Sequence, residues 1–177
     1  MVIEVREYDP AWPVLAEAAA RELRDALPGV FLELEHIGST SVPGLAAKPI
    51  IDLMASVPSL DTVAEREDVL ARLGYHRVDT GMRERLFYPR DDDDGRRTHH
   101  LHVVTASSWG TRNERLLRDH LRAHPEAAGA YGDLKRELAT RIDDPDEYTR
   151  AKTDLVQELV DAARASRGLP LVTVWEE

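Results

Sequence analysis

A short apolar segment between two prolines constrains the fold more than any other feature of the sequence. Residues 49–57 read PIIDLMASV, and Pro58 follows them. This segment is almost wholly apolar, which is typical of a strand buried at the centre of a sheet. Its one charged residue is Asp52. The chain is therefore expected to build a covered sheet around this strand.

Turn residues and apolar spacing predict the elements before and after this strand. Asp9 and Pro10 are a typical helix start, and an apolar repeat follows them at Trp12, Leu15, Ala19, Leu23 and Leu27. Further elements are expected as a strand within 30–37, a helix from Ser59 to Leu73 that stops at Gly74, and strands at 75–78, 84–88 and 98–105. The acidic run at 91–95 is expected to form an exposed hairpin tip.

The sequence after Ser108 is expected to be helical. One helix is predicted from Trp109 to His124, a second begins at Pro125, and a third opens at residues 144–147, where Asp144 and Glu147 match a capping box. The tail at 171–175 has the composition of an extra edge strand or of a contact with a second copy. A homodimer is a further expectation from this tail.

The order of these elements predicts an α+β fold, with a mixed β-sheet, an N-terminal helix and a C-terminal helical annex. We expect an α/β core over residues 1–107 and an annex over 108–177, packed as one domain overall. The length of 177 residues fits one domain that buries its core without covalent cross-links.

Composition excludes several classes of function. The net charge of −10 repels polyanions, so broad nucleic-acid binding is not expected. The chain has no cysteine, which excludes disulfides, zinc–thiolate sites and a thiol nucleophile. No signal peptide is visible, and no apolar run approaches the length of a membrane span. These features predict a soluble, cytoplasmic protein without membrane partners.

The loop from Gly38 to Gly44 has the composition of an anion site. Gly38 lets the backbone approach a ligand closely, and three hydroxyl side chains follow it, at Ser39, Thr40 and Ser41. Hydroxyl and backbone N–H donors suit a phosphate group, and Lys48 adds a positive charge. The alternative is an ordinary polar turn between two strands.

Asp52 needs a partner if its strand is buried, because an unpaired buried charge costs several kcal/mol. A metal ion, another cation or a network of donors could supply that partner, and so could backbone N–H groups or an arginine. Strand alternation places Ile50, Asp52 and Met54 on one face.

Two further clusters carry chemistry that suits the same kind of site. His100 and His102 share one face of the predicted strand at 98–105, so both imidazoles can converge on one ligand. Arg83 and Arg85 share a face of the preceding strand, and a guanidinium suits phosphate. Strand histidines also occur simply as surface or core-lining residues.

The sequence resembles the GrpB-like family, which is assigned to the nucleotidyltransferase superfamily of DNA polymerase beta. The resemblance rests first on HIGSTSVPGLAAKPIIDL at residues 36–53. It continues with YDPAWP at 8–13, HLHV at 100–103, LRDHLRAHP at 117–125, YGDLK at 131–135 and YTRAK at 148–152. It covers residues 5 to about 165, and the motif at 36–53 is the specific one.

This resemblance implies a nucleotidyltransferase-type fold and a set of roles. Gly38 and Ser39 match the Gly-Ser pair that grips a triphosphate in active members, and Asp52 matches the first of two carboxylates that hold Mg²⁺. The second carboxylate is replaced by Met54. His100 or His102 stands where a third carboxylate is expected. Two-metal chemistry needs hard oxygen ligands, so these replacements suit one ion such as Mn²⁺ or Zn²⁺, or no metal.

The leading hypothesis is a protein that binds a nucleotide or a phosphorylated small molecule and transfers a nucleotidyl group to a small acceptor. Phosphate binding is assigned to Gly38, Ser39, Thr40, Ser41, Lys48 and Arg85. A divalent metal (Mg²⁺, Mn²⁺ or Zn²⁺) is assigned to Asp52, His100 and His102, and catalysis to Asp52 and His102. Lys135 and Lys152 either close the pocket or lie on the helix surface, and the surface position is the favoured expectation.

Two alternatives remain from the sequence. The first is a catalytically inactive accessory module, because GrpB-like domains resemble the segment fused to dephospho-CoA kinase in some bacteria. The second is metal-dependent hydrolysis of a phosphoester, which would release phosphate without an acceptor.

Overall fold

A computed structural model describes residues 3–174 of the chain, which folds into two compact units. The sheet unit consists of residues 11–37 and 50–110, and the helical unit consists of residues 3–10, 38–49 and 111–174. The helical unit therefore includes the turn between the first two strands. Each unit is described by itself, and the predicted division into 1–107 and 108–177 stays a prediction.

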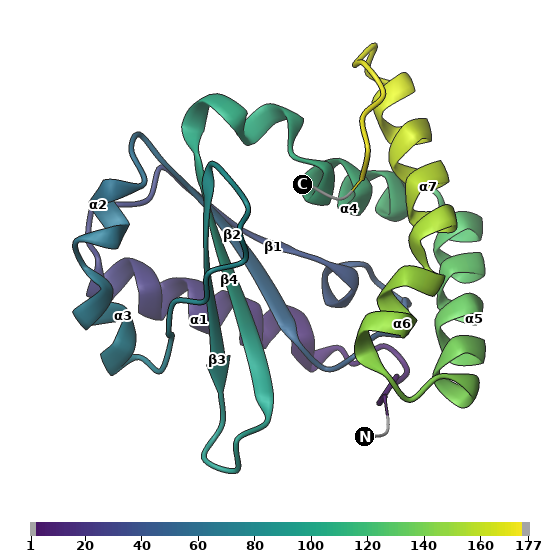
Figure 1. Cartoon of the computed structure of the whole chain (residues 1–177), viewed down its shortest axis with the longest axis horizontal. Helices are drawn as coiled ribbons and strands as arrows, with labels where there is room; N and C mark the ends of the chain where they lie inside the picture. Colours follow the sequence, from purple (N-terminus) through teal and green to yellow (C-terminus); the bar gives the residue numbers. More distant parts are fainter. Residues whose placement is uncertain (1–2, 175–177) are drawn as a thin grey trace. The chain divides into compact units, whose positions relative to one another are not determined.

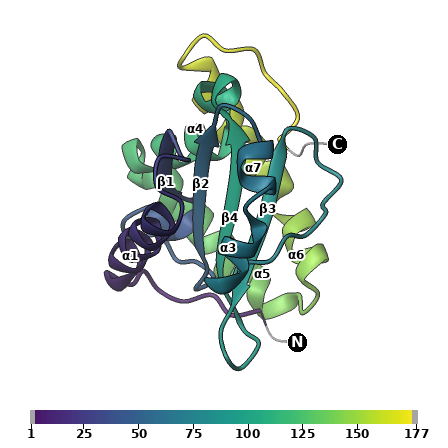
Figure 2. The same cartoon turned by 90° about the vertical axis from the view of Figure 1, so that its left-hand side faces the viewer.

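The sheet unit contains four strands and three α-helices (Figure 1). Its elements are α1 (Ala11–Ala26), β1 (Glu33–Ile37), β2 (Ile51–Val57), α2 (Asp61–Ala64), α3 (Glu67–Arg72), β3 (Arg85–Asp91) and β4 (Arg97–Thr105). The strand order is β1-β2-β4-β3, as Figure 2 shows. Because β2 and β4 run parallel while both outer pairs are antiparallel, the sheet is mixed. The predicted α+β class and the central position of β2 are confirmed.

One face of this sheet forms the core of the sheet unit. Helix α1 packs against β1 and β2 and buries Trp12, Ala16 and Leu23. Opposite them, the sheet buries Leu53 and Leu101. The residues predicted to lie on the buried face of α1 are buried except Leu15, which is 49% exposed. Ala16 and Ala20 lie on the buried face instead.

Several boundaries within the sheet unit differ from the prediction. The expected helix from Ser59 to Leu73 is two short helices, α2 and α3, separated at the polar pair Glu65 and Arg66. The expected strand at 75–78 is an irregular segment, in which the N–H of His76 donates to the carbonyl of Pro89 at 3.1 Å. Proline has no N–H to return that bond, so a regular ladder cannot form there.

The hairpin between β3 and β4 carries the acidic run at its tip, as predicted. The N–H of Asp92 donates to the carbonyl of Arg96 at 2.8 Å, and Gly95 adopts a positive φ of 79°. All residues from Asp91 to Gly95 are exposed. At the other end of β3, the prediction was wrong for Arg83, which is exposed and precedes the strand. Glu84 separates it from Arg85 with a φ of 60°.

The helical unit is built from four α-helices around an apolar cluster. These helices are α4 (Asn113–Ala123), α5 (Pro125–Arg141), α6 (Pro145–Ala151) and α7 (Thr153–Ala165). The 3₁₀ turn η1 (Ser39–Ser41) belongs to the same unit. Val42 and Leu45, which follow η1, pack with Leu121, Tyr131 and Val160 from three of the helices. This cluster fixes the turn on the helices of its own unit.

Helix boundaries in this part of the chain follow local capping chemistry. The predicted helix from Trp109 to His124 is divided into η2 (Ala106–Thr111) and α4, because Arg112 between them is extended. The predicted capping residue Asp144 is confirmed, since its carboxylate accepts the N–H of Glu147 at 2.8 Å. No helix within residues 3–174 is long and apolar enough to cross a membrane.

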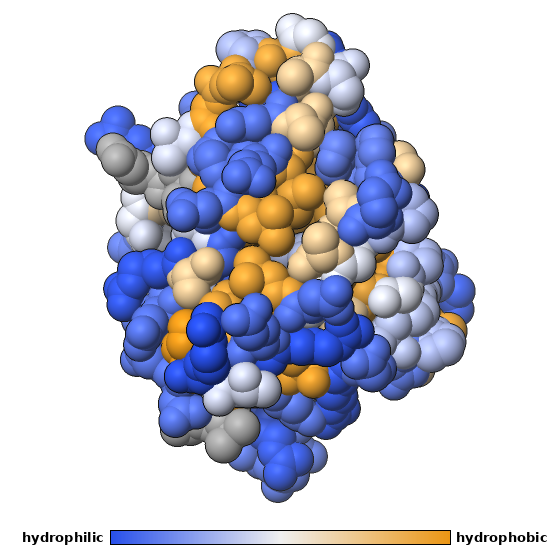
Figure 3. Space-filling model, turned by 90° about the vertical axis from the view of Figure 1, so that its right-hand side faces the viewer, coloured by the Kyte–Doolittle hydropathy of each residue, from blue (hydrophilic) through white to orange (hydrophobic). Residues whose placement is uncertain are grey.

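The tail does not form the predicted strand over residues 171–174. Instead, the Gln157 amide donates to the carbonyl of Val172 at 2.9 Å, and its oxygen accepts the N–H of Val174 at 2.9 Å. Leu171 stays 60% exposed, and Trp175 lies outside the described residues. Figure 3, which looks onto the side where α5 and α7 lie, shows apolar atoms reaching the surface between hydrophilic ones. Self-association stays a prediction.

We expect Gly38→Ala to lower the free energy of unfolding by about 1–3 kcal/mol, because Gly38 has φ 75° and ψ −177°, a region that only glycine adopts without strain. Urea denaturation measures this change. The matched control is Gly129→Ala within α5, where an added Cβ meets nothing within 4 Å. This control should stabilise the protein by about 0.5–1 kcal/mol. Equal stability of Gly38→Ala and the unsubstituted protein would contradict the strained turn.

Candidate functional site

Strand register brings polar residues of β2 and β4 side by side on the face of the sheet opposite α1. Asp52 of β2 is paired with Ile37 of β1 and with His100 of β4. Two residues farther along, Met54 is paired with His102. Because successive side chains of a strand point to opposite faces, Asp52, His100 and His102 all project from the same face.

The Asp52 carboxylate contacts both imidazoles. Its Oδ1 lies 2.9 Å from Nδ1 of His100, a hydrogen bond, and 4.0 Å from Nε2 of His102. The Asp52 side chain is 25% exposed, and the His102 side chain is 16% exposed. The ring of Phe87 on β3 packs against both imidazoles, with centroid distances of 5.1 and 4.9 Å. The carboxylate is thus enclosed by groups that hold its two neighbours in place.

The surroundings of Asp52 keep its carboxylate ionised. Burial by itself would raise the pKa of Asp52, but the hydrogen bond from His100 and the charges of His100, His102 and His36 outweigh it. The net effect lowers the pKa below its ordinary value. A negative charge is therefore maintained on the central strand near pH 7.

The third histidine of this strand lies on the other face. His99 is paired with Ile51 rather than with Asp52, and its ring meets that of Tyr75 edge-on. Burial, with the nearby Arg90 and His100, lowers the pKa of His99 to about 4. His99 is therefore neutral near pH 7, and its half-buried ring packs against Tyr75 on that face.

Each of the two imidazoles also has an arginine close to one of its ring nitrogens. Nη1 of Arg85 lies 3.4 Å from Nδ1 of His102, and Nη1 of Arg97 lies 3.2 Å from Nε2 of His100. Arg85 is buried, whereas Arg97 is exposed and also donates to Asp91. Arg97 was missed from the sequence, because it begins the strand and does not share the spacing of the histidines.

One oxygen and two nitrogens at this site have the arrangement of a metal site. The ligating atoms of Asp52, His100 and His102 lie within 4.8 Å of one another. Met54 is fully buried in an apolar cluster with Ile37 and Val104, so it adds no ligand. One carboxylate with two imidazoles suits a single ion of the Mn²⁺ or Zn²⁺ type better than a pair of Mg²⁺ ions.

The turn after Gly38 belongs to the helical unit, where its hydroxyls have distinct positions. The Ser41 hydroxyl donates to the carbonyl of Gly38, so it holds the turn closed. Thr40 is buried, and Ser39 is half-buried. Arg122 of α4 donates from Nε to the carbonyl of Ser41 at 3.0 Å. Of the three hydroxyls, that of Ser39 is the best placed to meet a ligand.

Lys135 of α5 is buried beside this turn, so the favoured expectation of a surface position is wrong. Its Nζ donates to Oγ of Ser39 and, at 3.1 Å, to the carbonyl of Ala46. The same Nζ lies 4.3 Å from the centroid of the Tyr131 ring. The sequence held a signal for this position, because Lys135 stands four residues after Tyr131 and three before Leu138 on the buried face of α5.

Lys48 and Lys152 meet at one aromatic ring. Their ammonium groups lie 4.5 and 4.6 Å from the centroid of the Tyr148 ring. Burial lowers the pKa of Lys48 from its ordinary value, and it raises the pKa of Tyr148 to about 12. These cation–π contacts fix both lysines within the helical unit.

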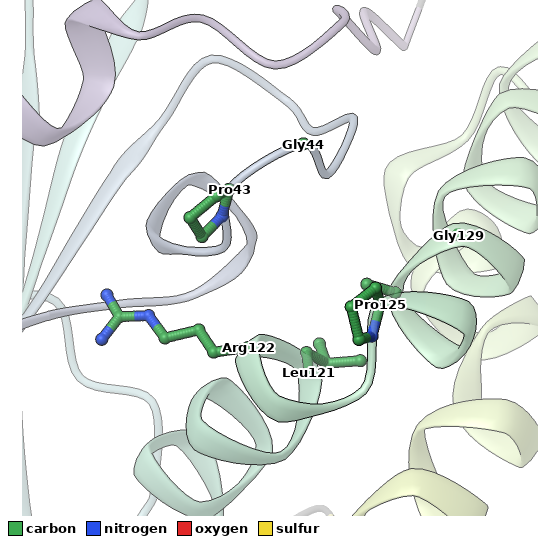
Figure 4. A pocket seen from close by; sticks show the side chains of 7 residues that line it. Pro43, Gly44, Leu121, Arg122, Pro125 and Gly129 are labelled. Carbon is green, nitrogen blue, oxygen red and sulfur yellow. The ribbon is translucent and has the colours of Figure 1, made fainter.

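A cavity of about 460 Å³ lies elsewhere in the helical unit, between the turn and the junction of α4 and α5 (Figure 4). Most of its lining is apolar or small, and it includes Pro43, Gly44, Leu121 and Ala128. Figure 4 shows the Arg122 side chain extending from α4 towards the turn. None of the residues that line this cavity is among those predicted for phosphate or metal binding.

Comparison with known structures defines the class of fold. The Cid1 poly(U) polymerase, in a structure with MgGTP bound, matches with a TM-score of 0.53 and 16% identity over 76% of this chain and 44% of that chain. At this identity the match concerns the fold, which is nucleotidyltransferase-like.

The family follows from closer matches. The GrpB protein family matches residues 2–162, and this chain belongs to it. The crystal structure of GrpB from Enterococcus faecalis has a TM-score of 0.85 and 33% identity over 93% of this chain and 99% of that one. A UPF0157 protein of Pseudomonas aeruginosa is 37% identical over 96% of this chain and 71% of its own length.

This chain is also similar to part of a larger enzyme. The dephospho-CoA kinase of Mycolicibacterium paratuberculosis is 30% identical over 81% of this chain, but the match spans only 42% of the kinase. The chain is therefore similar to one part of that protein.

We expect the paired carboxylate to stabilise the fold above its titration range. Because the folded pKa of Asp52 is depressed, its contribution is present above the unfolded value near 4 and is lost as the pH falls through the lower folded pKa. The difference in unfolding free energy between the unsubstituted protein and Asp52→Asn should therefore shrink between about pH 5 and pH 2. Urea denaturation across this range measures it, and a difference independent of pH would contradict the assignment.

Proposed function

We propose that this protein binds a nucleotide or another phosphorylated small molecule together with one divalent metal ion, and that it transfers a nucleotidyl group to a small acceptor. The observation that carries the proposal is the ionised Asp52 on a nucleotidyltransferase-like sheet, with His100 and His102 converging on it. A carboxylate on the central strand of a sheet needs partners on its own face, and the two imidazoles that supply them are also metal-ligand groups.

The metal is assigned to Asp52, His100 and His102. A bound divalent ion would polarise a phosphoryl oxygen and neutralise charge that develops on it. Within the protein, Asp52 holds the negative charge that attracts the ion, while Phe87 and Arg85 fix the imidazoles. As the alternative role for the same residues, we assign Asp52 to the orientation of the acceptor and His102, where it does not bind the ion, to its deprotonation.

Phosphate binding is assigned to the turn and its cations. Gly38, Ser39, Thr40 and Ser41 supply the backbone, and the Ser39 hydroxyl, which accepts from Lys135, keeps its own proton for a phosphate oxygen. Lys48 and Lys135 bring positive charge within the helical unit. Arg85 is assigned the same role within the sheet unit. In each unit, phosphate oxygens are the ligand atoms whose chemistry matches these donors.

The second candidate function is an accessory module without catalysis. Two observations favour it: Met54 stands where a second carboxylate would be required, and the chain matches one part of a dephospho-CoA kinase. In that case Asp52 would have a structural role, and its replacement would leave ligand affinity unchanged.

We expect nucleoside triphosphate with Mn²⁺ or Zn²⁺ to stabilise the protein, because a ligand at a hundredfold excess over its Kd contributes about 2.7 kcal/mol. For a chain of this size, that corresponds to a rise in melting temperature of roughly 5–10 °C. Thermal denaturation with each nucleotide and with Mg²⁺, Mn²⁺ or Zn²⁺ measures the shift. Asp52→Asn should abolish the metal-dependent part of it.

The matched control is Asp93→Asn at the exposed hairpin tip, which should retain the full shift. Lys135→Met should weaken nucleotide binding without metal, which separates the phosphate site from the metal site. If Asp52→Asn and Asp93→Asn give the same shift, the metal assignment is wrong. If no nucleotide or metal shifts the unsubstituted protein, the accessory module is the better description.

A further inference from the structure

Each imidazole beside Asp52 lies between the carboxylate and a guanidinium. His102 has Arg85 3.4 Å from its Nδ1, and its Nε2 faces Asp52 at 4.0 Å. His100 has the opposite orientation, with Arg97 3.2 Å from its Nε2 and Asp52 2.9 Å from its Nδ1. In both cases one ring nitrogen faces an arginine and the other faces the carboxylate.

This arrangement fixes the position of the proton on each ring. A guanidinium has N–H donors and no acceptor, so the ring nitrogen that faces it must accept through its lone pair. In a neutral imidazole the other nitrogen then carries the proton. His102 is therefore protonated at Nε2 and His100 at Nδ1, and both N–H groups point towards Asp52.

These protons occupy the positions that a metal would need. An ion held by Asp52 would bind the lone pairs of the same two nitrogens, which requires each proton to move to the nitrogen that now faces an arginine. A protonated nitrogen cannot accept from a guanidinium. Metal binding by either histidine is therefore possible only after its arginine turns away.

The two arginines differ in their freedom to do so. Arg97 is exposed and donates from Nε to Asp91 at 2.6 Å, so it keeps a partner when it leaves His100. Arg85 is only 7% exposed, so moving its guanidinium requires the surrounding side chains to rearrange. His100 can therefore bind an ion once Arg97 moves, whereas the buried Arg85 keeps His102 from doing so.

We propose that Arg85 withholds His102 from the metal by fixing its Nε2–H tautomer, so that the chain by itself offers an ion only Asp52 and His100. Two protein ligands leave most of the coordination sphere open. Oxygen atoms of a phosphorylated ligand would complete it, as is usual for ions that arrive with nucleotide phosphates. This inference rests on the proposed function, whose metal site it narrows from three protein ligands to Asp52 and His100, and it makes Arg85 a specificity-determining residue of that site.

The first measurement is made on the unsubstituted protein without metal. Long-range ¹H–¹⁵N correlation of the histidine rings distinguishes a protonated ring nitrogen from one with a lone pair. The expected spectrum has His102 protonated at Nε2 and His100 at Nδ1 near pH 7.5. A proton on Nδ1 of His102 would overturn the inference, whatever the protein binds.

The second measurement is titration with Zn²⁺ alone, for the unsubstituted protein, Arg85→Met and Arg97→Met. Arg85→Met should bind Zn²⁺ on the order of tenfold more tightly or better, because a charge-assisted hydrogen bond no longer opposes the third ligand. Arg97→Met removes the same charge from beside the other imidazole and should gain less than about threefold. A purely coulombic effect of removing an arginine would appear in both variants, so the difference between them tests the hydrogen bond to His102.

Equal Zn²⁺ affinity of Arg85→Met and the unsubstituted protein, with Zn²⁺ bound by both, would overturn the inference and leave the proposed metal site intact. If neither protein binds Zn²⁺, the metal assignment of the proposed function fails instead. The ring spectrum then decides the inference by itself, because it reads the tautomer of His102 without any metal.

Discussion

The sheet unit depends on the contacts that the Asp52 carboxylate makes with two imidazoles. Asp52 stands on β2, between β1 and β4 and among residues that are almost all buried. An ionised carboxylate there needs polar neighbours on the same face, and strand register brings two positions of β4 next to it. Histidines occupy both positions. The ring of Phe87 and the two arginines then hold those imidazoles in place.

The helical unit holds a buried charge by the same principle. The Lys135 ammonium is surrounded by acceptors and one aromatic face, from Ser39, Ala46 and Tyr131. Because two of these acceptors flank the apolar residues Val42 and Leu45, the ammonium fastens the turn to α5. Burial of such a group is expensive unless its donors are satisfied. Two kinds of contact within the helical unit therefore hold the turn after Gly38 in place. These are the hydrogen bonds of Lys135 and the apolar cluster around Val42 and Leu45.

The sequence predicted most of the fold because its signals were local. The apolar segment at 49–57, the capping residue Asp144 and the acidic hairpin tip each depend on neighbours in the chain. The predictions failed where a distant partner decides the structure. The segment at 75–78 lies beside Pro89 of β3, which has no N–H to complete a ladder of hydrogen bonds. In α1, the residues that face the sheet include Ala16 rather than Leu15.

The sequence predicted which residues form the candidate site, but it did not predict how they are arranged in space. Alternation placed Asp52, His100 and His102 on matching faces, but only the parallel pairing of β2 with β4 brings them together. The tautomers follow from Arg85 and Arg97, and neither strand spacing nor composition indicates such contacts. Similarly, helical spacing placed Lys135 on the face of Tyr131, whereas its contact with Ser39 depends on the long-range packing of the turn.

Anomalous diffraction from crystals of the unsubstituted protein, grown with Mn²⁺ and a nucleoside triphosphate, would locate an ion bound at Asp52. We expect one manganese peak at the Asp52 carboxylate and Nδ1 of His100, with phosphate oxygens as further ligands. A crystal in which the nucleotide binds while no peak lies at Asp52, or in which the peak lies on carboxylates elsewhere, would contradict it.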